Sequence, residues 1–389
     1  MTTTINNEHK KLNVPILRFP EFQGEWEKSK LSDLCTFFSG GTPSSSNKDF
    51  YGGDIAFIRS GELHADSTEL FISQDGYDNS SAKMVEIGDL LLAMYGATSG
   101  DIAISKIKGA INQAILCIRT NQNKKFIESA WNKHVSKILR KYLQGGQGNL
   151  SADIVKGISF SFPTLEEQER IANLISLLDE RIATQNKIIE DLKKLKSAII
   201  EKLYKEIQGT WYSYRQLFSI INERNKQLEY SNVLSASQER GMVSREDLNL
   251  DIHFERSNIS TYKIVKNGDY VIHLRSFQGG FAFSEKTGIC SPAYTVLRPN
   301  NLLVYGYLSN YFTSRDFVKS LIIVTYGIRD GRSINVDEWL DMKVVIPSKE
   351  QQTHIVNVIE SIENKIKNEE TYSNCLLNQK QYLLRQMFI

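Results

Sequence analysis

Few residues in this sequence have the types and spacing that catalysis requires. Transfer of a methyl group to a base would need a glycine-rich cofactor loop and an Asn/Asp-Pro-Pro-aromatic motif. The nearest match, Ser291–Tyr294 (SPAY), lacks the second proline, and an internal repeat aligns it with Asn112–Ile115 (NQAI), where a strand is expected to begin. Gly145–Gly148 lacks the Lys-Ser/Thr pair of a phosphate-binding loop. No catalytic residue and no cofactor are therefore predicted.

Metal and nuclease chemistry are equally poorly represented. The six histidines form no HExxH or CxxH spacing, so no metal site is expected. A nuclease would need clustered carboxylates beside a lysine, whereas Asp153 and Asp337 are expected to lie in helices or at strand edges. The chain is predicted not to be an enzyme.

The sequence contains an internal duplication. Gly88–Leu91 (GDLL) returns in the second half of the chain as Gly268–Val271 (GDYV). At a nearly constant offset from this match, Leu203-Tyr204 returns as Met387-Phe388. The sequence therefore predicts two copies of one domain.

Each copy has two parts. The first mixes short strand-like runs with glycine-rich turns and predicts an α+β globule, with short helices over 125–143 and 302–321. The second is a charged segment without Gly or Pro, in which apolar residues recur at alternating four- and three-residue steps. This heptad seam predicts a long coiled-coil helix after each globule.

Bulk composition limits the class of protein. The chain has 389 residues, enough for two or three domains, and no apolar run of about 18 residues that could span a membrane. Its start is polar and its four cysteines lie far apart, which favours a cytoplasmic protein with reduced thiols. The net charge is only +2, so a partner would have to supply much of any phosphate contact.

Two α+β globules, each followed by a heptad helix, closely resemble the specificity subunits of type I restriction–modification systems. Pro163–Ile171 (PTLEEQERI) is similar to the start of a spacer helix in that family, and Pro347–Gln352 (PSKEQQ) matches it less fully. Leu17–Phe22 (LRFPEF) with Trp26 also resembles the family's N-terminus. The resemblance covers essentially the whole chain.

The resemblance implies an α+β fold in which two pseudo-repeated target recognition domains are separated by a pair of long antiparallel coiled-coil helices. It implies double-stranded DNA as one partner, two methyltransferase subunits as others, and motor-nuclease subunits as further candidates. The predicted domains are the first recognition domain at 1–164, the central spacer helix at 165–208, the second recognition domain at 209–348 and the C-terminal spacer helix at 349–389.

Residues that contact DNA would then lie in equivalent loops whose polar side chains differ between the copies. Arginine suits guanine O6/N7, and Gln or Asn suits adenine N6/N7, because each makes two coplanar hydrogen bonds. The candidates are Tyr95, Ser99, Gln144, Gln147, Asn149, Arg275, Ser276, Gln278, Arg329 and Arg332. A second interpretation is that these are ordinary solvated loops with turn glycines, and that Tyr95 belongs to the core.

Four polar residues interrupt the seam and are predicted to fix the register of the helices. An antiparallel register that sets Lys196 against Glu369 and Gln185 against Lys380 gives each of them a charged or amide partner. Sliding one helix by a heptad would set Lys196 against Ile362, stranding a buried charge. Alternatively, the two lysines extend to solvent at the edge of the seam.

We interpret the chain as a non-catalytic subunit that reads a bipartite DNA target and holds methyltransferase subunits. One alternative is a single-chain adenine methyltransferase or nuclease with its own recognition domain, which would retain a methyl donor. The other is a coiled-coil adaptor whose globules bind proteins, which would not retain DNA together with a methyltransferase.

Overall fold

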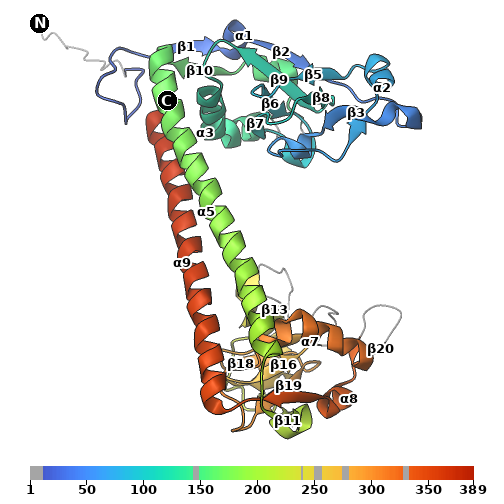
Figure 1. The fold of residues 1–389 in the computed structure, drawn as a ribbon. Coiled ribbons are helices and arrows are strands. Elements are labelled where there is room, and N and C mark those ends of the chain that lie inside the picture. The colour runs from blue at the N-terminus through green and yellow to red at the C-terminus, as the bar shows by residue number, and fades with distance from the viewer. Residues whose placement is uncertain (1–11, 143–148, 238–239, 249–255, 274–279, 327–332) are drawn as a thin grey trace, which may run out of the picture. The chain divides into compact units, whose positions relative to one another are not determined.

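The computed structural model describes residues 12–142, 149–237, 240–248, 256–273, 280–326 and 333–389 (Figure 1). The chain forms two compact units. The first unit comprises Met1–Gln185 and Tyr372–Ile389, and the second comprises Asn186–Thr371. Each unit contains one α+β globule and part of each of two long helices, α5 (Leu165–Lys205) and α9 (Lys349–Met387). The α+β fold with two long helices is thereby confirmed.

The first globule is built on a four-stranded antiparallel sheet, β2-β9-β6-β7, which packs against helix α3 (Lys124–Tyr142). These strands are β2 (Cys35–Ser39), β9 (Ile115–Thr120), β6 (Leu90–Ala93) and β7 (Ile102–Ile104). A second sheet contains β4 (Phe71–Ile72), β3 (Tyr51–Ile58), β8 (Gly109–Ile111) and β5 (Lys83–Val85). The remaining elements are β1 (Glu27–Lys30) paired with β10 (Ser159–Phe162), and the short helices α1 (Leu31–Leu34), α2 (Gln74–Asp78) and α4 (Ala152–Lys156).

The second globule repeats the same sheet order, β12-β19-β16-β17. These strands are β12 (Phe218–Ile221), β19 (Thr295–Pro299), β16 (Tyr270–Ile272) and β17 (Phe281–Phe283). Four further pairs are β11 (Thr210–Ser213) with β22 (Lys343–Ile346), β13 (Leu234–Ser237) with β14 (Gly241–Ser244), β15 (Lys263–Val265) with β18 (Gly288–Cys290), and β20 (Thr325–Tyr326) with β21 (Ser333–Ile334). The helices are α6 (Tyr214–Leu217), α7 (Arg315–Ser320) and α8 (Val336–Asp341).

The helix expected over 302–321 is therefore wrong in extent. Residues 301–310 form turns, and the helical part is the single short helix α7 between two 3₁₀ turns. In place of a continuous helix, this segment packs aromatic side chains into the core, where Phe312 and Phe317 lie with their ring centroids 4.7 Å apart. Tertiary packing here overrides the local pattern. Asp153 and Asp337 lie in the first turns of α4 and α8, as expected.

An ion pair between a buried aspartate and a partly exposed arginine is repeated in both sheets. Asp89, which precedes β6, accepts a hydrogen bond from Arg119 of β9 at 2.8 Å. Asp269, which precedes β16, accepts two from Arg298 of β19, each at 2.9 Å. The Asp269 side chain is only 2% exposed. The repeated Gly-Asp motif thus carries a carboxylate that ties neighbouring strands together in each globule.

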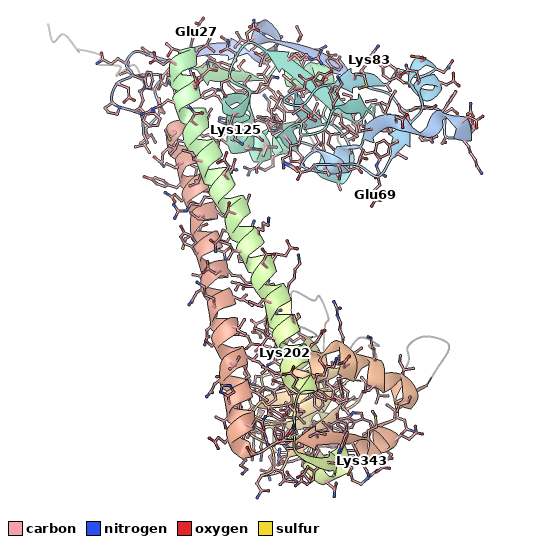
Figure 2. The ribbon with its side chains drawn as sticks, viewed as in Figure 1. Glu27, Glu69, Lys83, Lys125, Lys202 and Lys343 are labelled. Carbon is pink, nitrogen blue, oxygen red and sulfur yellow. The ribbon has the colours of Figure 1, made fainter. Side chains whose placement is uncertain are left out.

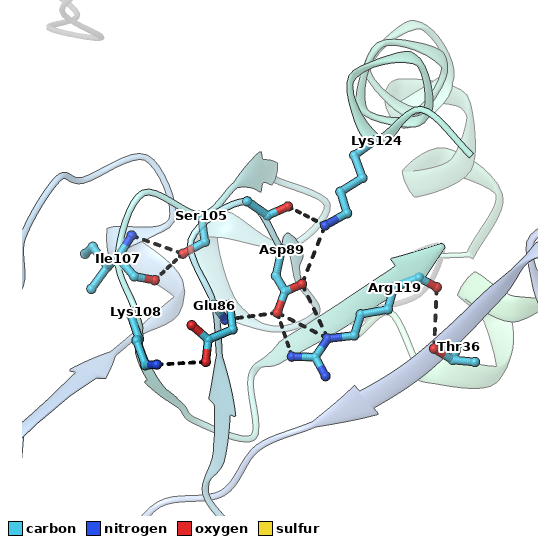
Figure 3. Close-up of polar contacts among 9 residues, drawn as sticks. Thr36, Glu86, Asp89, Ser105, Ile107, Lys108, Arg119 and Lys124 are labelled. Carbon is cyan, nitrogen blue, oxygen red and sulfur yellow. Dashed lines mark hydrogen bonds and ion pairs between the residues drawn. The ribbon is translucent and has the colours of Figure 1, made fainter. Parts of the chain in front are cut away.

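The surroundings of Asp89 lower its pKa (Figure 3). Burial is the largest single influence and acts to raise the pKa. It is outweighed by hydrogen bonds from the Arg119 guanidinium and the Glu86 N–H and by the nearby Lys124 ammonium, whose nitrogen lies 3.6 Å from Oδ1. The carboxylate is therefore held in its charged form inside the globule.

Each long helix begins with a buried glutamine that binds it to its globule. The side-chain amide of Gln168 donates to the Pro163 carbonyl at 2.9 Å and to the Gln122 side chain at 2.8 Å. Gln352 repeats this arrangement, donating to the Pro347 carbonyl at 3.0 Å. Both glutamines are 1% exposed. The Pro-to-Gln spacing of the two helix starts is explained by this shared hydrogen bond.

Beside Gln168, the buried carboxylate of Glu167 holds the N-terminal segment. It accepts hydrogen bonds from the Arg18 guanidinium at 2.8 and 2.7 Å and from the Trp26 indole at 3.3 Å. We expect Glu167→Ala to lower the free energy of unfolding of the first unit by about 2–3 kcal/mol, because it leaves the buried Trp26 indole without an acceptor and the half-buried Arg18 guanidinium without its counter-charge. Glu166→Ala, at an exposed neighbouring position, should change it by less than about 0.5 kcal/mol in the same calorimetric measurement. Equal effects of the two substitutions would contradict this account.

In each unit the parts of α5 and α9 run antiparallel, and their buried faces form the predicted heptad seam. In the first unit Asp179 and Arg181 contact Lys380 and Tyr372, and in the second Lys193 and Lys196 contact Glu370 and Glu363. The buried seam residues include Ile175, Ile182, Ile189, Ile355, Ile359, Ile366 and Leu376. No helix among the described residues has both the length and the apolar character needed to cross a membrane.

The predicted partner of Lys196 is wrong. Its ammonium forms an ion pair with Glu363 at 2.5 Å, six residues before the expected Glu369. The observed register is the one in which Lys196 lies near Ile362, the arrangement that was expected to strand its charge. The charge is not stranded, because the Lys196 side chain remains 26% exposed and its nitrogen reaches the flank of the other helix. Long cationic side chains therefore tolerate a seam position that the charge-pairing argument excluded.

The predicted pairing of Gln185 with Lys380 is also wrong. Lys380 forms an ion pair with Asp179 at 2.5 Å. Lys125 of α3, which Figure 2 labels, reaches the same carboxylate at 2.8 Å. Gln185 and Ser373 are both buried, at 5% and 6% exposure. Asp179 lies on the flank of the seam, so a contact between globule and helices, in addition to the seam itself, holds the register in the first unit.

Candidate nucleic-acid interface

The first candidate loop, Tyr95–Ser99, follows strand β6 and folds back on itself. Gly96 has φ +77°, a conformation that glycine adopts readily, and the Ser99 hydroxyl donates to the Met94 carbonyl at 3.0 Å. The Tyr95 ring packs partly against the main core cluster of the globule. Tyr95 therefore has the structural role that was weighed for it, while Ser99 is half-buried in the turn.

The structure places Asn149, the last residue of the second candidate loop of the first globule, beside the first loop. Asn149 is exposed, and the next residue, Leu150, is buried and donates its N–H to the Met94 carbonyl at 3.0 Å. Asn149 thus lies next to the turn that carries Tyr95 and Ser99, although the two are far apart in sequence.

Helix α3 packs against the residue that follows the Tyr95–Ser99 turn. The Trp131 indole donates to the Gly100 carbonyl at 2.8 Å, and a Cβ at Gly100 would lie 3.0 Å from side-chain atoms of Val135 and Leu139. Gly100 has φ +89°. The close approach of backbone and helix requires glycine here and holds the end of the Tyr95–Ser99 turn against α3.

The other seven candidates lie outside the described residues. They are Gln144, Gln147, Arg275, Ser276, Gln278, Arg329 and Arg332. Among the described residues of the second globule, the His273 N–H donates to the Gly280 carbonyl at 2.8 Å, and Thr325 pairs with Ile334 across β20 and β21.

Sequence reasoning missed the exposed basic side chains at the C-terminal end of α3. Lys137, Arg140 and Lys141 are all exposed. The signal was available in the run Lys133–Tyr142 (KHVSKILRKY), whose cations recur at three- and four-residue spacing. It was overlooked because the comparison of the two copies concentrated on polar loops.

A polar cavity of about 570 Å³ lies at the other end of the same sheet, where Asp89 precedes β6. Its charged lining groups satisfy one another: Arg119 and Lys124 both contact Asp89, and the Lys124 ammonium also donates to the Gly88 carbonyl at 2.6 Å (Figure 3). Of the DNA-contact candidates that the structure describes, Tyr95, Ser99 and Asn149, none lines it. These contacts give Asp89, Arg119 and Lys124 a structural role in the first globule. Across the described ranges, no three His, Cys, Asp or Glu side chains are grouped so that they could hold a metal ion.

Comparisons with known proteins agree with this architecture. Residues 23–194 match the family model of the type I restriction modification DNA specificity domain. The chain is 23% identical to the specificity subunit of the type I restriction enzyme MjaVIII from Methanocaldococcus jannaschii, over 90% of this chain and 88% of that protein. A further relative from the same organism, named as a putative MjaX specificity subunit, is 24% identical over 92% of this chain and 91% of its own length.

Among solved structures, the fold is similar to that of the S subunit of a type I restriction–modification system from M. genitalium. The TM-score is 0.56 at 14% identity, covering 97% of this chain and 99% of the other. The sequence relatives, the matched domain over residues 23–194 and the duplicated fold agree with one another. The chain is similar to the specificity subunits of type I restriction–modification systems and has their fold.

Proposed function

We propose that this chain is the DNA-recognition subunit of a type I restriction–modification complex and that each globule reads one half of a split target. The observation that carries the proposal is the repeated sheet whose β6 and β16 ends lead into loops of different polar sequence. One scaffold with two different loop sets is suited to reading two different half-sites, because base-edge hydrogen bonds depend on the side chains presented.

The proposed partners are two methyltransferase subunits, with motor-nuclease subunits in the restricting form of the complex. Methyl transfer and cleavage are assigned to those subunits, and this chain is proposed to act in the cytoplasm without catalytic activity of its own. The family names of its relatives support this division of labour. So does its net charge of +2, which leaves much of the phosphate contact to partners.

Mapping of methylated adenines in the genome, with and without this gene, tests the proposal. The expected result is a bipartite methylated motif that disappears when the gene is deleted. Retention of a methyl donor by the purified chain would instead favour a single-chain methyltransferase. Failure of the chain to retain DNA in the presence of the methyltransferase subunits would favour a protein adaptor.

Two arginines of the second globule should then read part of one half-site. We expect the double substitution Arg329→Ala and Arg332→Ala to relax or abolish recognition of that half, because one bidentate arginine contact is worth about 1–3 kcal/mol of discrimination. Methylation of oligonucleotides with single-base changes measures this. Arg215→Ala is a matched control, because Arg215 is an exposed arginine of α6 that pairs with Asp341 of α8 at 2.8 Å. Equal loss of recognition in both half-sites would contradict the two-reader arrangement.

A further inference from the structure

Although the whole chain is nearly neutral, positive charge is concentrated on helix α3. Its sequence, KKFIESAWNKHVSKILRKY, contains six lysines and arginines and a single acidic residue, Glu128. The first three cations are used inside the first unit. Lys124 contacts Asp89, Lys125 contacts Asp179 and Lys133 donates to the Phe388 carbonyl. They hold the helix in place.

The last three cations of α3 make no such contacts with other elements among the described residues. Lys137, Arg140 and Lys141 are spaced at i, i+3 and i+4, so they share one face of the helix, and all three are exposed. Within the part of the chain that the structure describes, no carboxylate lies within ion-pair distance of any of them. The Arg140 guanidinium donates to the Ser136 carbonyl, and the Lys141 ammonium lies 5.0 Å from the Tyr142 ring. We call these three residues the basic patch.

The basic patch lies at the C-terminal end of α3, and the chain leads from there to Asn149. Val135 and Leu139 pack against Gly100 at the end of the Tyr95–Ser99 turn, so the patch lies on the opposite face of the helix from that turn. The Leu150 N–H bonds to the Met94 carbonyl at the start of the turn, which places Asn149 beside it. Like charges that crowd one face of a helix repel each other, and an arriving polyanion relieves that repulsion.

We infer that the basic patch binds the phosphate backbone of DNA beside the first half-site and orients the first globule for base reading. This inference rests on the proposed function and adds a division of labour within it.

The test uses the full chain assembled with its methyltransferase subunits. The patch variant carries Lys137→Gln, Arg140→Gln and Lys141→Gln. Affinity is measured over a series of salt concentrations for two duplexes, one with the mapped target and one without it. The slope of log K against log salt should become shallower by about 2–3 for both duplexes, since each lost phosphate contact contributes about 0.9. Affinity at about 0.1 M salt should fall at least tenfold, while the ratio between the two duplexes stays the same.

Two further variants make the result decisive. Lys187→Gln, Lys194→Gln and Lys202→Gln remove the same charge from exposed positions on α5 (Figure 2 labels Lys202) and should leave the slope within about 0.5 of the wild type. Lys137→Arg with Lys141→Arg keeps the charge and should retain the wild-type slope, which excludes a general folding defect as the cause.

Three outcomes would overturn the inference. In the first, the patch and α5 variants change the slope equally. In the second, the patch variant keeps the wild-type slope. In the third, it fails to assemble with the methyltransferase subunits, which would identify an acidic protein surface as the partner. Loss of sequence-specific binding by the wild-type complex is a different result, because it removes the proposed function itself.

Discussion

Exchange of residues 209–348 for the same segment of another specificity subunit is expected to replace one half of the methylated target and leave the other half unchanged. The two ends of this segment are joined to each other, since Thr210 of β11 pairs with Ile346 of β22. The donor segment must supply a glycine at its first position, because a Cβ at Gly209 would lie 2.2 Å from the Ile346 carbonyl oxygen. If the donor segment meets these two conditions, the second globule can be exchanged as one segment.

Mapping of methylated positions in cells that carry the exchanged chain measures the result. A new second half with the original first half and the original spacing is the expected motif. Changes in both halves would mean that the globules do not read independently. The exchange must preserve the apolar contacts that Ile200, Ile355 and Ile359 of the long helices make with the second core. An exchanged chain that still assembles with its methyltransferase subunits shows that these contacts survived.

Removal of the arginine that pairs with a buried aspartate should have a large effect on stability. We expect Arg298→Ala to lower the free energy of unfolding of the second unit by about 3–5 kcal/mol, because it leaves the buried carboxylate of Asp269 without its counter-charge. For a unit of this size the corresponding fall in Tm is about 10 °C. Calorimetry of the full chain, in which the two units can melt separately, is the appropriate measurement.

The first globule provides the matched control. Arg119→Ala removes the equivalent arginine, but Asp89 keeps Lys124 at 3.6 Å, and the Arg119 side chain is itself 45% exposed. The loss of stability should therefore be clearly smaller than for Arg298→Ala. If the two variants lose equal stability, the nearby lysine contributes nothing and the electrostatic account is wrong.

The same network determines how stability depends on pH. The pKa of Asp89 is lower in the folded chain than in the unfolded chain, so the carboxylate stabilises the fold above the unfolded value of about 3.9. That contribution is lost as the pH falls through the folded value. In Arg119→Ala the folded pKa rises toward the unfolded one, so the variant should show a weaker fall in stability below about pH 4 than the wild type.

Much of the fold follows from repetition along the sequence. The duplicated Gly-Asp motif, the two Pro-to-Gln helix starts and the heptads were enough to predict two α+β globules with a long helix after each. Contacts between residues far apart in sequence were not predictable in the same way. Asp89 precedes β6 and Arg119 lies on β9, and the repeated Gly-Asp motif gives no indication that the two side chains form an ion pair.

The helix register illustrates the physical limit most clearly. Matching the polar residues of the seam led to Lys196 against Glu369, on the assumption that a lysine at a seam position is buried. Its side chain instead extends out of the seam to Glu363. In the first unit Asp179, on the flank of the helix, joins Lys125 of the globule to Lys380. Heptad spacing contains no information about a third element packed against the pair.

The candidate interface was predicted in part. Comparison of the two copies selected the loops at the ends of β6 and β16, and the structure places Asn149 beside the Tyr95–Ser99 turn. The assignment of individual arginines and glutamines to bases remains a prediction. The basic patch escaped notice because charge counted over whole segments cancels, whereas the exposed charge of one helical face does not.

The first unit is assembled from distant parts of the chain, and this affects its folding during synthesis. Its core includes Leu384, Met387 and Phe388, and the Phe388 ring lies 5.0 Å from that of Phe126. The second unit is continuous from Asn186 to Thr371. At a translation rate of about 5–20 residues per second, roughly 10–40 s pass between synthesis of the first globule and synthesis of the C-terminal side chains that complete its core. During that interval its apolar surface is open to chaperones and to aggregation, so the globule that is synthesised first is the one that completes its core last.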